Sequence, residues 1–168
     1  AVPRDIAVTP VITTTNLKKR YKGSAEEALK GINMTIRQGE FFGILGPNAA
    51  GKSTLIAILC GILPYSSGEA KLFGRHISQS SDWLKSRFGL VPQEIALYED
   101  LSARENLNFW GKMYGLRGGT LKRRVDEVLE LIGLTERAKE RVGKYSGGMK
   151  RRVNIGVALL HKPRLIYM

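Results

Sequence analysis

Cysteine and histidine are scarce in this sequence, which holds one cysteine and two histidines in 168 residues. The lone Cys60 excludes an internal disulfide and lies in an apolar helical pattern, so we expect a small buried side chain and a reducing compartment. His76 and His161 have no cluster of His, Cys or carboxylate residues beside them in the sequence. We therefore interpret both as surface residues rather than metal ligands, with His161 at the end of a helix.

Long hydrophobic runs are also missing. The longest nearly continuous one, from Leu55 to Leu63, is well short of the ~20 residues of a membrane-spanning helix. The start of the chain, AVPRDIAVTPVITTTN, has no continuous apolar core of the secretory type, and we interpret it as a loose lead-in. With 43% apolar and 25% charged residues, the sequence predicts one soluble globular domain.

Acidic residues are few beside basic ones, 15 against 27, and the net charge is +12. Such a charge suits a binder of nucleic acid or anionic lipid. The lysines and arginines are spread along the chain, however, and no basic stripe with interleaved aromatic residues occurs. The short basic clusters at 122–124 and 150–152 fall on helical patterns, where they form solvated faces. We therefore expect no nucleic-acid partner.

What the sequence does have is a phosphate-binding loop. Residues 46–54, GPNAAGKST, fit the pattern G-x-x-x-x-G-K-[ST] at every specified position. Gly46 and Gly51 suit a loop that turns sharply and brings backbone N–H groups to phosphate oxygens, and the helix after it contributes its positive end. Lys52 would then reach the β- and γ-phosphates, and the Ser53 hydroxyl would hold a Mg²⁺ ion.

The remaining patterns of the first half predict a mixture of strands and short helices. The helix after the loop is expected to stop at Gly61. The expected elements are short strands at 11–17 and 29–36, a buried parallel strand at 41–45, a hairpin or pair of edge strands at 69–77, a short helix at 81–87 and a strand at 88–91.

From about residue 100 the pattern becomes helical. Residues 102–105 form a capping box at the start of one helix, and a second helix runs from about Leu121 to Ile132 with an apolar face. We expect residues ~100–145 to form a helical subdomain inserted into the α/β core. A further helix follows Ser146, which can cap it and leave the N–H groups of its first turn bare.

The residue patterns alone leave three roles open. Tyr21 either stacks on a nucleobase or packs across strands. Gln93, directly after a strand, lies either at the ligand-binding carboxyl edge of a sheet or in an ordinary loop. The helix start at Ser146-Gly147-Gly148 is either a second anion site or only a cap.

Taken together, these stretches make the chain from Asn16 onward resemble the ATP-binding subunit of ATP-binding-cassette (ABC) transporters. GPNAAGKST is similar to the family's first phosphate loop, VPQE at 91–94 to its glutamine loop, and YSGGMKRR at 145–152 to its signature sequence, in the family's order and spacing. The resemblance implies an α/β fold, a P-loop NTPase core of the ABC ATPase type with an antiparallel β subdomain and an inserted α-helical subdomain. It divides the single domain 1–168 into a β subdomain with the loop core (1–92), a helical subdomain (93–145) and the signature helix with the start of the next core strand (146–168).

The resemblance also implies bound ATP and Mg²⁺. Tyr21 would stack on adenine, Lys52 and Gln93 would take part in catalysis, and Ser53 and Gln93 would ligate the metal. The phosphates would be held by Gly46, Pro47, Asn48, Ala49, Ala50, Gly51, Lys52, Ser53 and Thr54. From the opposite subunit of a head-to-tail dimer, the nucleotide would be contacted by Ser146, Gly147, Gly148 and Met149.

The chain departs from the family's pattern in places. Ala49 replaces a frequent glycine, Tyr145 a frequent leucine and Met149 a frequent glutamine, and we expect function to survive the changes at 49 and 149. The stretch 164–168 resembles the family's next core strand, which an Asp for Mg²⁺ and a Glu as general base follow; the chain as given ends before them. We therefore expect a fold incomplete at its C-terminus and no hydrolysis by the 168-residue chain, although the full-length parent would be an ATPase.

The runs at 89–107 and 145–163 are most similar to the stand-alone ATPase subunits of exporters. The implied partners are membrane-spanning permease subunits, which would dock on the helix at 102–116 and its preceding loop, and a second nucleotide-binding subunit. The implied location is the cytoplasmic face of the membrane. The alternative is an ABC ATPase that acts on ribosomes or DNA; DNA-repair members carry a coiled-coil insertion, and no heptads run between Gln93 and the signature here. A P-loop kinase would have no reason to place Ser-Gly-Gly at this helix start.

Overall fold

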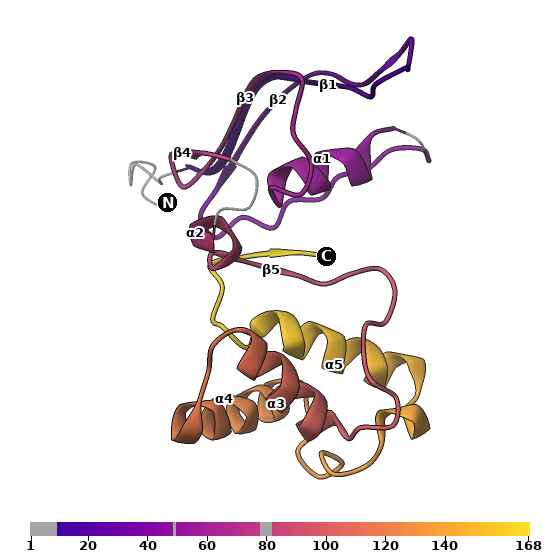
Figure 1. Cartoon of the computed structure of the whole chain (residues 1–168), viewed down its shortest axis with the longest axis vertical. Helices are drawn as coiled ribbons and strands as arrows, with labels where there is room; N and C mark the ends of the chain where they lie inside the picture. Colours follow the sequence, from indigo (N-terminus) through magenta and orange to yellow (C-terminus); the bar gives the residue numbers. More distant parts are fainter. Residues whose placement is uncertain (1–9, 49, 78–81) are drawn as a thin grey trace, which may run out of the picture. The chain divides into compact units, whose positions relative to one another are not determined.

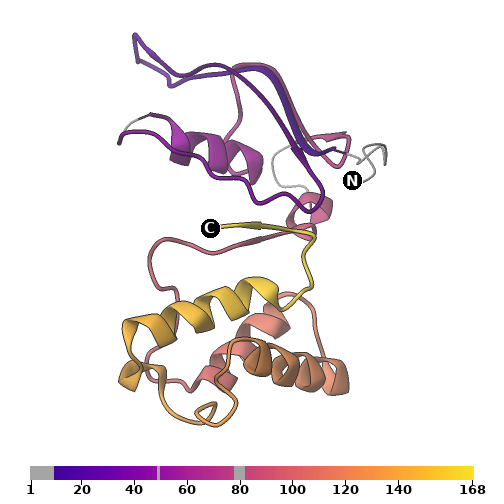
Figure 2. The ribbon, with the colours of Figure 1, turned by 180° about the vertical axis from the view of Figure 1, so that it is seen from behind.

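The structure, a computed structural model, describes residues 10–48, 50–77 and 82–168. The chain forms two compact units, Ala1–Lys85 and Ser86–Met168. Figure 1 follows the chain by colour from the N-terminus to the C-terminus, and Figure 2 shows it from behind. We predicted a first subdomain that ends at residue 92, and that functional division stays a prediction. No helix within the described ranges has the length and apolar character to cross a membrane.

An antiparallel sheet of four strands, in the order β2-β1-β3-β4, forms the body of the first unit. The pairing confirms the strands predicted at 11–17 and 29–36 and the edge pair predicted at 69–77. His76 is exposed, as predicted. The strands are β1 (Pro10–Arg20), β2 (Glu27–Arg37), β3 (Ser67–Leu72) and β4 (Arg75–His76).

The central strand β1 contains a β-bulge at Asn16. Between Thr14 and Leu17 the register of β1 shifts against β2, and it shifts against β3 over the same stretch, which places one extra residue in β1. An extra residue moves the alternation of inward and outward side chains by one position. Ile12 and Thr14 are accordingly buried before the bulge, and Leu17 and Lys19 after it.

Helix α1 (Lys52–Leu59) follows the phosphate loop and lies alongside the sheet in both views (Figures 1 and 2). Its last turn is closed by Cys60, and Gly61 has a positive φ of 68°, which confirms the predicted stop. Cys60 is buried, and this burial raises the pKa of its thiol to about 12, as expected of a packing residue. The short helix predicted at 81–87 is present as α2 (Asp82–Lys85), while Ser81 lies outside the described residues.

The prediction of a buried strand at 41–45 is wrong. This segment is irregular and its large side chains face solvent, with Phe41 94% and Leu45 96% exposed. A run that is apolar on both faces forms a central strand only where neighbouring strands satisfy its backbone groups and cover its faces. Neither sheet among the described residues includes this segment. Apolar sequence alone therefore does not hold it in a strand.

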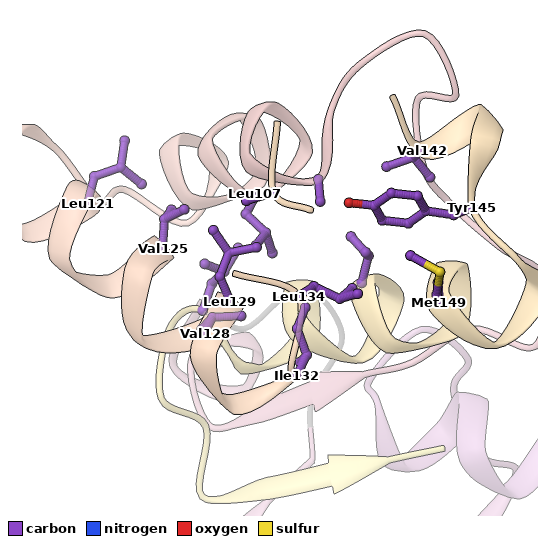
Figure 3. Packing of buried hydrophobic residues seen from close by; sticks show 14 residues of the cluster. Leu107, Leu121, Val125, Val128, Leu129, Ile132, Leu134, Val142, Tyr145 and Met149 are labelled. Atoms are coloured by element: carbon purple, nitrogen blue, oxygen red, sulfur yellow. The ribbon is translucent and has the colours of Figure 1, made fainter. Parts of the chain in front are cut away.

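The second unit is built on helices α3 (Ala103–Met113), α4 (Gly118–Leu131) and α5 (Gly147–Leu159), with a short 3-10 helix, η1 (Val142–Lys144). Their apolar faces meet in one cluster, part of which is shown in Figure 3. The helices predicted within ~100–145 are present, whereas the bounds of the helical subdomain stay a prediction, since the cluster also includes residues of α5. The fully buried members of the cluster include Ala103, Leu107, Val125, Val128, Leu129, Val142 and Val153.

The helix ends follow their sequence signals. The capping box of α3 is complete: Ser102 Oγ accepts from the Glu105 N–H over 3.2 Å, and Glu105 Oε2 accepts from the Ser102 N–H over 2.8 Å. Ser102 Oγ also donates to Glu105 Oε2 over 2.7 Å, and this bond, together with the one from the Ser102 N–H, lowers the pKa of the Glu105 carboxyl. Helix α4 begins at Gly118, earlier than the predicted Leu121, because glycine adopts the positive φ of 53° found at that first residue.

Two strands, β5 (Phe88–Leu90) and β6 (Leu165–Tyr167), pair in parallel in the second unit, as predicted for 88–91 and 164–168. Gly89 of β5 lies against the end of α5, since a Cβ built on it would be 2.3 Å from Ala158 O. A side chain at this position would therefore separate the strand from the helix.

His161 is not the surface residue that we predicted. Its ring is half-buried, stacks on the ring of Tyr114 with centroids 4.3 Å apart, and lies with Nε2 2.8 Å from Phe88 O. Burial lowers the pKa of the imidazole, against the opposing effect of the Phe88 carbonyl. Its position after a helix, which suggested a surface residue, instead places it against Tyr114 at the end of α3 and Phe88 of β5.

The helical cluster should respond to truncation of a single buried side chain. We expect Val128→Ala to lower the free energy of unfolding by about 2 kcal/mol, because Val128 is fully buried and its truncation leaves a cavity. Leu131→Ala, in the same helix, is the control, since Leu131 is 67% exposed and its change should be nearly neutral. Denaturant unfolding followed by far-UV circular dichroism measures both. Equal losses in the two variants would contradict the described packing.

Candidate functional site

The phosphate loop is anchored at Gly51. This glycine is the N-cap of α1 and has a left-handed conformation, with φ 82°. A Cβ on it would be 2.4 Å from Ala28 O and 2.8 Å from Leu29 Cδ2 of β2. Gly51 therefore acts as the predicted pivot, which lets the helix start pack directly on the sheet. Gly46, the other predicted pivot, is not among the described glycines with positive φ.

Lys52 is folded back over this loop. Its Nζ donates to Gly46 O and to Pro47 O, over 2.6 Å in each case. These carbonyls surround the one cation within residues 46–54. A polyphosphate offers stronger acceptors than neutral carbonyls, so the same ammonium group is available to exchange these partners for phosphate oxygens.

The other loop residues are open to solvent. Ser53 is exposed on the first turn of α1, with its hydroxyl available for a metal ion, and Asn48 and Ala50 are exposed in the loop. The Ala50 N–H donates to Pro47 O over 3.2 Å. Ala49, also predicted to contact phosphate, lies outside the described residues.

Tyr21 lies beside the start of α1. It follows the last residue of β1, and its hydroxyl forms a hydrogen bond of 3.0 Å with Thr54 Oγ1. Its side chain is 45% exposed, and Lys19 Nζ is 5.4 Å from its ring centroid. The structure thus brings Tyr21 together with the phosphate loop, and leaves part of its ring uncovered.

The signature residues begin α5 in the second unit. Ser146 is the N-cap, and its Oγ accepts from the Met149 N–H over 3.3 Å. Gly147 and Gly148 are exposed in the first turn, and a Cβ on either would meet nothing within 4 Å. This helix start therefore presents uncovered backbone N–H groups, the chemistry that binds anions.

The two unusual residues of the signature belong to the core. Tyr145 is buried, and its hydroxyl donates to Arg137 O over 2.5 Å. The Met149 side chain is also buried, and Figure 3 shows it with Tyr145 at one end of the cluster. Because the Met149 N–H is bonded to Ser146, Met149 supports the helix start rather than presenting a group of its own.

The loop that contains Gln93 is held by α5. Gln93 is exposed, while the backbone on either side of it is fixed. The buried Asn154 donates to Pro92 O and Glu94 O over 3.4 and 3.3 Å and accepts from the Ala96 N–H over 3.3 Å. Arg151 also donates to Pro92 O.

Sequence reasoning missed these supporting residues. It singled out Gln93 and Ser146, but not Arg151 and Asn154, which connect the glutamine loop to the signature helix. A polar residue on the inward face of a predicted helix was the available signal for Asn154, because buried amides in proteins are hydrogen-bonded. Lys19 was missed as well.

The predicted site residues fall into two groups. Tyr21 and the loop at 46–54 belong to the first unit, and Gln93 and the signature residues belong to the second. Within the first group, the donor set fits a nucleoside triphosphate with Mg²⁺: a cation at Lys52, an exposed Ser53 hydroxyl, the N-terminus of α1 and a partly exposed aromatic ring.

The α/β fold with this loop and the Ser146 helix start defines a nucleotide-binding domain of the ABC ATPase type. The profile described as "ABC transporter" matches residues 29–168 of the chain. The chain belongs to this family.

Its similarity to particular members is high. The linearmycin resistance ATP-binding protein LnrL of Bacillus subtilis is 53% identical over 153 residues, which cover 91% of this chain and 49% of LnrL. The bacitracin transport ATP-binding protein BcrA of Bacillus licheniformis is 37% identical, over 94% of this chain and 50% of BcrA. The chain thus spans about half the length of these curated relatives.

The fold also matches a solved structure. That of cbiO1 from Clostridium perfringens, part of the ABC transporter complex cbiONQ, has a TM-score of 0.87 and 31% identity. The match covers 94% of this chain and 64% of cbiO1. The predicted fold class, an ABC-type P-loop core with a β subdomain and a helical subdomain, is confirmed.

Proposed function

We propose that this chain is the ATP-binding component of an ABC transporter, which couples ATP binding and hydrolysis to export of a substrate through separate membrane subunits. The observation that carries the proposal is the loop at 46–54. Gly51 begins α1 there as its N-cap, and the Lys52 ammonium group donates to the loop carbonyls. The names of LnrL and BcrA, a resistance protein and a transport protein, support an exporter. They give no support to an ABC ATPase that acts on ribosomes or DNA.

The proposed site binds ATP with Mg²⁺. In this proposal, Tyr21 stacks on adenine, Lys52 and the backbone at 46–54 hold the phosphates, and Ser53 and Gln93 ligate the metal, with Gln93 also reaching the attacking water. When bound, Mg²⁺ neutralises charge on the phosphates. The residues of the chain bind and orient the nucleotide.

The proposed partners are a second nucleotide-binding subunit and membrane-spanning permease subunits. In a head-to-tail dimer, the exposed helix start at Ser146-Gly147-Gly148 would contact the γ-phosphate bound by the other subunit. Helix α3 and its preceding loop would receive the permease, where Tyr98 (49% exposed), Phe109 (38%) and Met113 (68%) present apolar surface. The chain would then lie on the cytoplasmic face of the membrane.

An equilibrium titration tests the proposal. A fluorescent ATP analogue is bound to the chain and displaced by ATP and by inorganic tripolyphosphate. Saturable displacement by both supports a phosphate-loop site, and binding of neither overturns it. We expect no phosphate release from the 168-residue chain in the same buffer, because none of the residues assigned to the site is a carboxylate that could act as general base. Co-purification from solubilised membranes then tests for a permease.

The dimer can be tested at the signature. We expect Ser146→Arg to leave binding of ATP to the phosphate loop unchanged and to weaken ATP-dependent dimerisation about tenfold, because the larger side chain would fill the space of the partner's γ-phosphate. Light scattering with and without ATP measures the dimer fraction. Lys139→Arg, a change at an exposed site, is the control. Dimerisation that survives Ser146→Arg would argue against the head-to-tail arrangement.

A further inference from the structure

The bulge at Asn16 decides which way the end of β1 faces. Thr14 before the bulge and Lys19 after it are both buried, although an unbroken alternation would place an even and an odd residue on opposite faces. The shifted alternation carries Tyr21, two residues beyond Lys19, to the same side. Its hydrogen bond to Thr54 confirms that this side faces α1 and the phosphate loop.

Residues from three strands build the bulge. The Asn16 N–H donates to Asn33 Oδ1 over 2.8 Å, and Asn16 has a positive φ of 45°. Gly31 and Gly68 leave the room that Asn16 needs: a Cβ on Gly31 would be 2.7 Å from Asn16 Oδ1, and one on Gly68 would be 2.2 Å from Asn16 O. The direction of the strand end is therefore set by packing rather than left to a loose loop.

Lys19 is a buried cation at this strand end. Only 8% of its surface is exposed, whereas lysine is seldom so deeply covered unless it is paired. Its Nζ donates to Pro64 O over 2.6 Å and lies 5.4 Å from the centroid of the Tyr21 ring. These two contacts offset the loss of water around the ammonium group. A lysine needed only for solubility would point outward.

We propose that Lys19 is a positioning residue for nucleobase recognition, which holds the Tyr21 ring through its cation–π contact while Thr54 holds the hydroxyl. The inference rests on the proposed ATP-binding function and deepens it. The base would lie on the exposed part of the ring.

The physical reason is twofold. First, the contacts at the two ends of the side chain fix the ring before ligand arrives, so less rotational freedom is lost on stacking. Second, a cation near an aromatic ring attracts the ring's π electrons toward itself. The ring's opposite face then repels the electron-rich π system of a purine less, which strengthens stacking. Lys19 would thus act on the base through Tyr21, and not on the phosphates.

Comparison of two ligands tests this assignment. ATP has a nucleoside and inorganic tripolyphosphate does not, so a change in the ratio of their affinities between variants reports the contacts to the nucleoside. We expect Lys19→Met to weaken binding of ATP about three- to fivefold, the size of a cation–π contact at a partly exposed ring, and to leave tripolyphosphate binding unchanged. Lys18→Met is the matched control, because it removes the same charge from the neighbouring residue of β1, whose alternation points it to the other face.

A double-mutant cycle with Tyr21→Ala tests whether Lys19 acts on ATP binding through the Tyr21 ring. In the Tyr21→Ala background, Lys19→Met should no longer change ATP binding, since its effect runs through the ring. If Lys19→Met does not fold, Lys19→Gln replaces it, because the amide can still donate to Pro64 O without carrying the charge.

The outcomes distinguish the inference from the function beneath it. If the wild-type chain binds neither ligand, the proposed function fails and the inference with it. If both ligands bind and Lys19→Met weakens them equally, or weakens neither, the phosphate site stands and the role of Lys19 is overturned. An ATP effect of Lys19→Met that persists in the Tyr21→Ala background also overturns it.

Discussion

Replacement of Lys52 by alanine is expected to weaken ATP binding by at least about 100-fold, since two charge-assisted hydrogen bonds to phosphate would be lost. The structure adds a reason beyond charge. Lys52 Nζ also joins Gly46 O to Pro47 O, so the variant removes the group that holds the loop's own carbonyls together. Displacement of a fluorescent ATP analogue measures the change.

The control for Lys52 is Lys22→Ala. Lys22 is exposed next to Tyr21, so its replacement removes an equal charge from the same unit without touching the loop. We expect it to alter ATP affinity less than about twofold, and less at higher salt. Equal losses in the two variants would reduce the role of Lys52 to general attraction by a basic surface. An unchanged affinity in Lys52→Ala would remove the phosphate loop from the proposed site.

Replacement of Gly51 by alanine is the second change with a large expected effect. An alanine here would have to keep the positive φ of 82°, which a side chain disfavours. Its Cβ would also approach Ala28 O to 2.4 Å, so α1 would have to move away from β2. We expect the free energy of unfolding of the first unit to fall by about 3 kcal/mol or more, with loss of measurable ATP binding. Denaturant unfolding and the same displacement assay follow the two effects.

Gly39→Ala separates the backbone strain from the steric clash, which Gly51→Ala combines. Gly39 has the same φ of 82°, but a Cβ on it would meet nothing within 4 Å. Its replacement therefore carries only the backbone strain, about 1 kcal/mol. If Gly51→Ala is no worse than Gly39→Ala, the helix start is not packed on β2 as described.

Local signals in the sequence were sufficient for the helical unit. Each of its signals depends on residues close together in the sequence, and all are present in the structure: the capping box at Ser102, the apolar face from Leu121 to Ile132 and the cap at Ser146. The phosphate loop is equally local, because its pivot at Gly51 and its cation at Lys52 are fixed by spacing.

The features that sequence reasoning missed depend on contacts between distant residues. The apolar run at 41–45 predicted a strand, but a strand exists only through its neighbours, and within the described ranges no strand pairs with this segment, which leaves Phe41 94% exposed. The bulge at Asn16 requires Gly31 and Gly68 from two other strands. Lys19 was not singled out, because the shift in alternation that buries it is not visible in the sequence of β1 alone.

The pairing of β1 with β3 has a consequence for the order in which the chain folds. Ile12 pairs with Leu72 across nearly the whole first unit, so this contact must close a long loop, whereas α3 packs on α4, the next helix along the chain. Pro64, the partner of Lys19, lies just before β3. We infer that the support beneath Tyr21 forms at a late stage of folding, because it depends on this long-range pairing. We infer that a chain arrested before that stage would already hold α3 against α4, but not a fixed ring beside the phosphate loop.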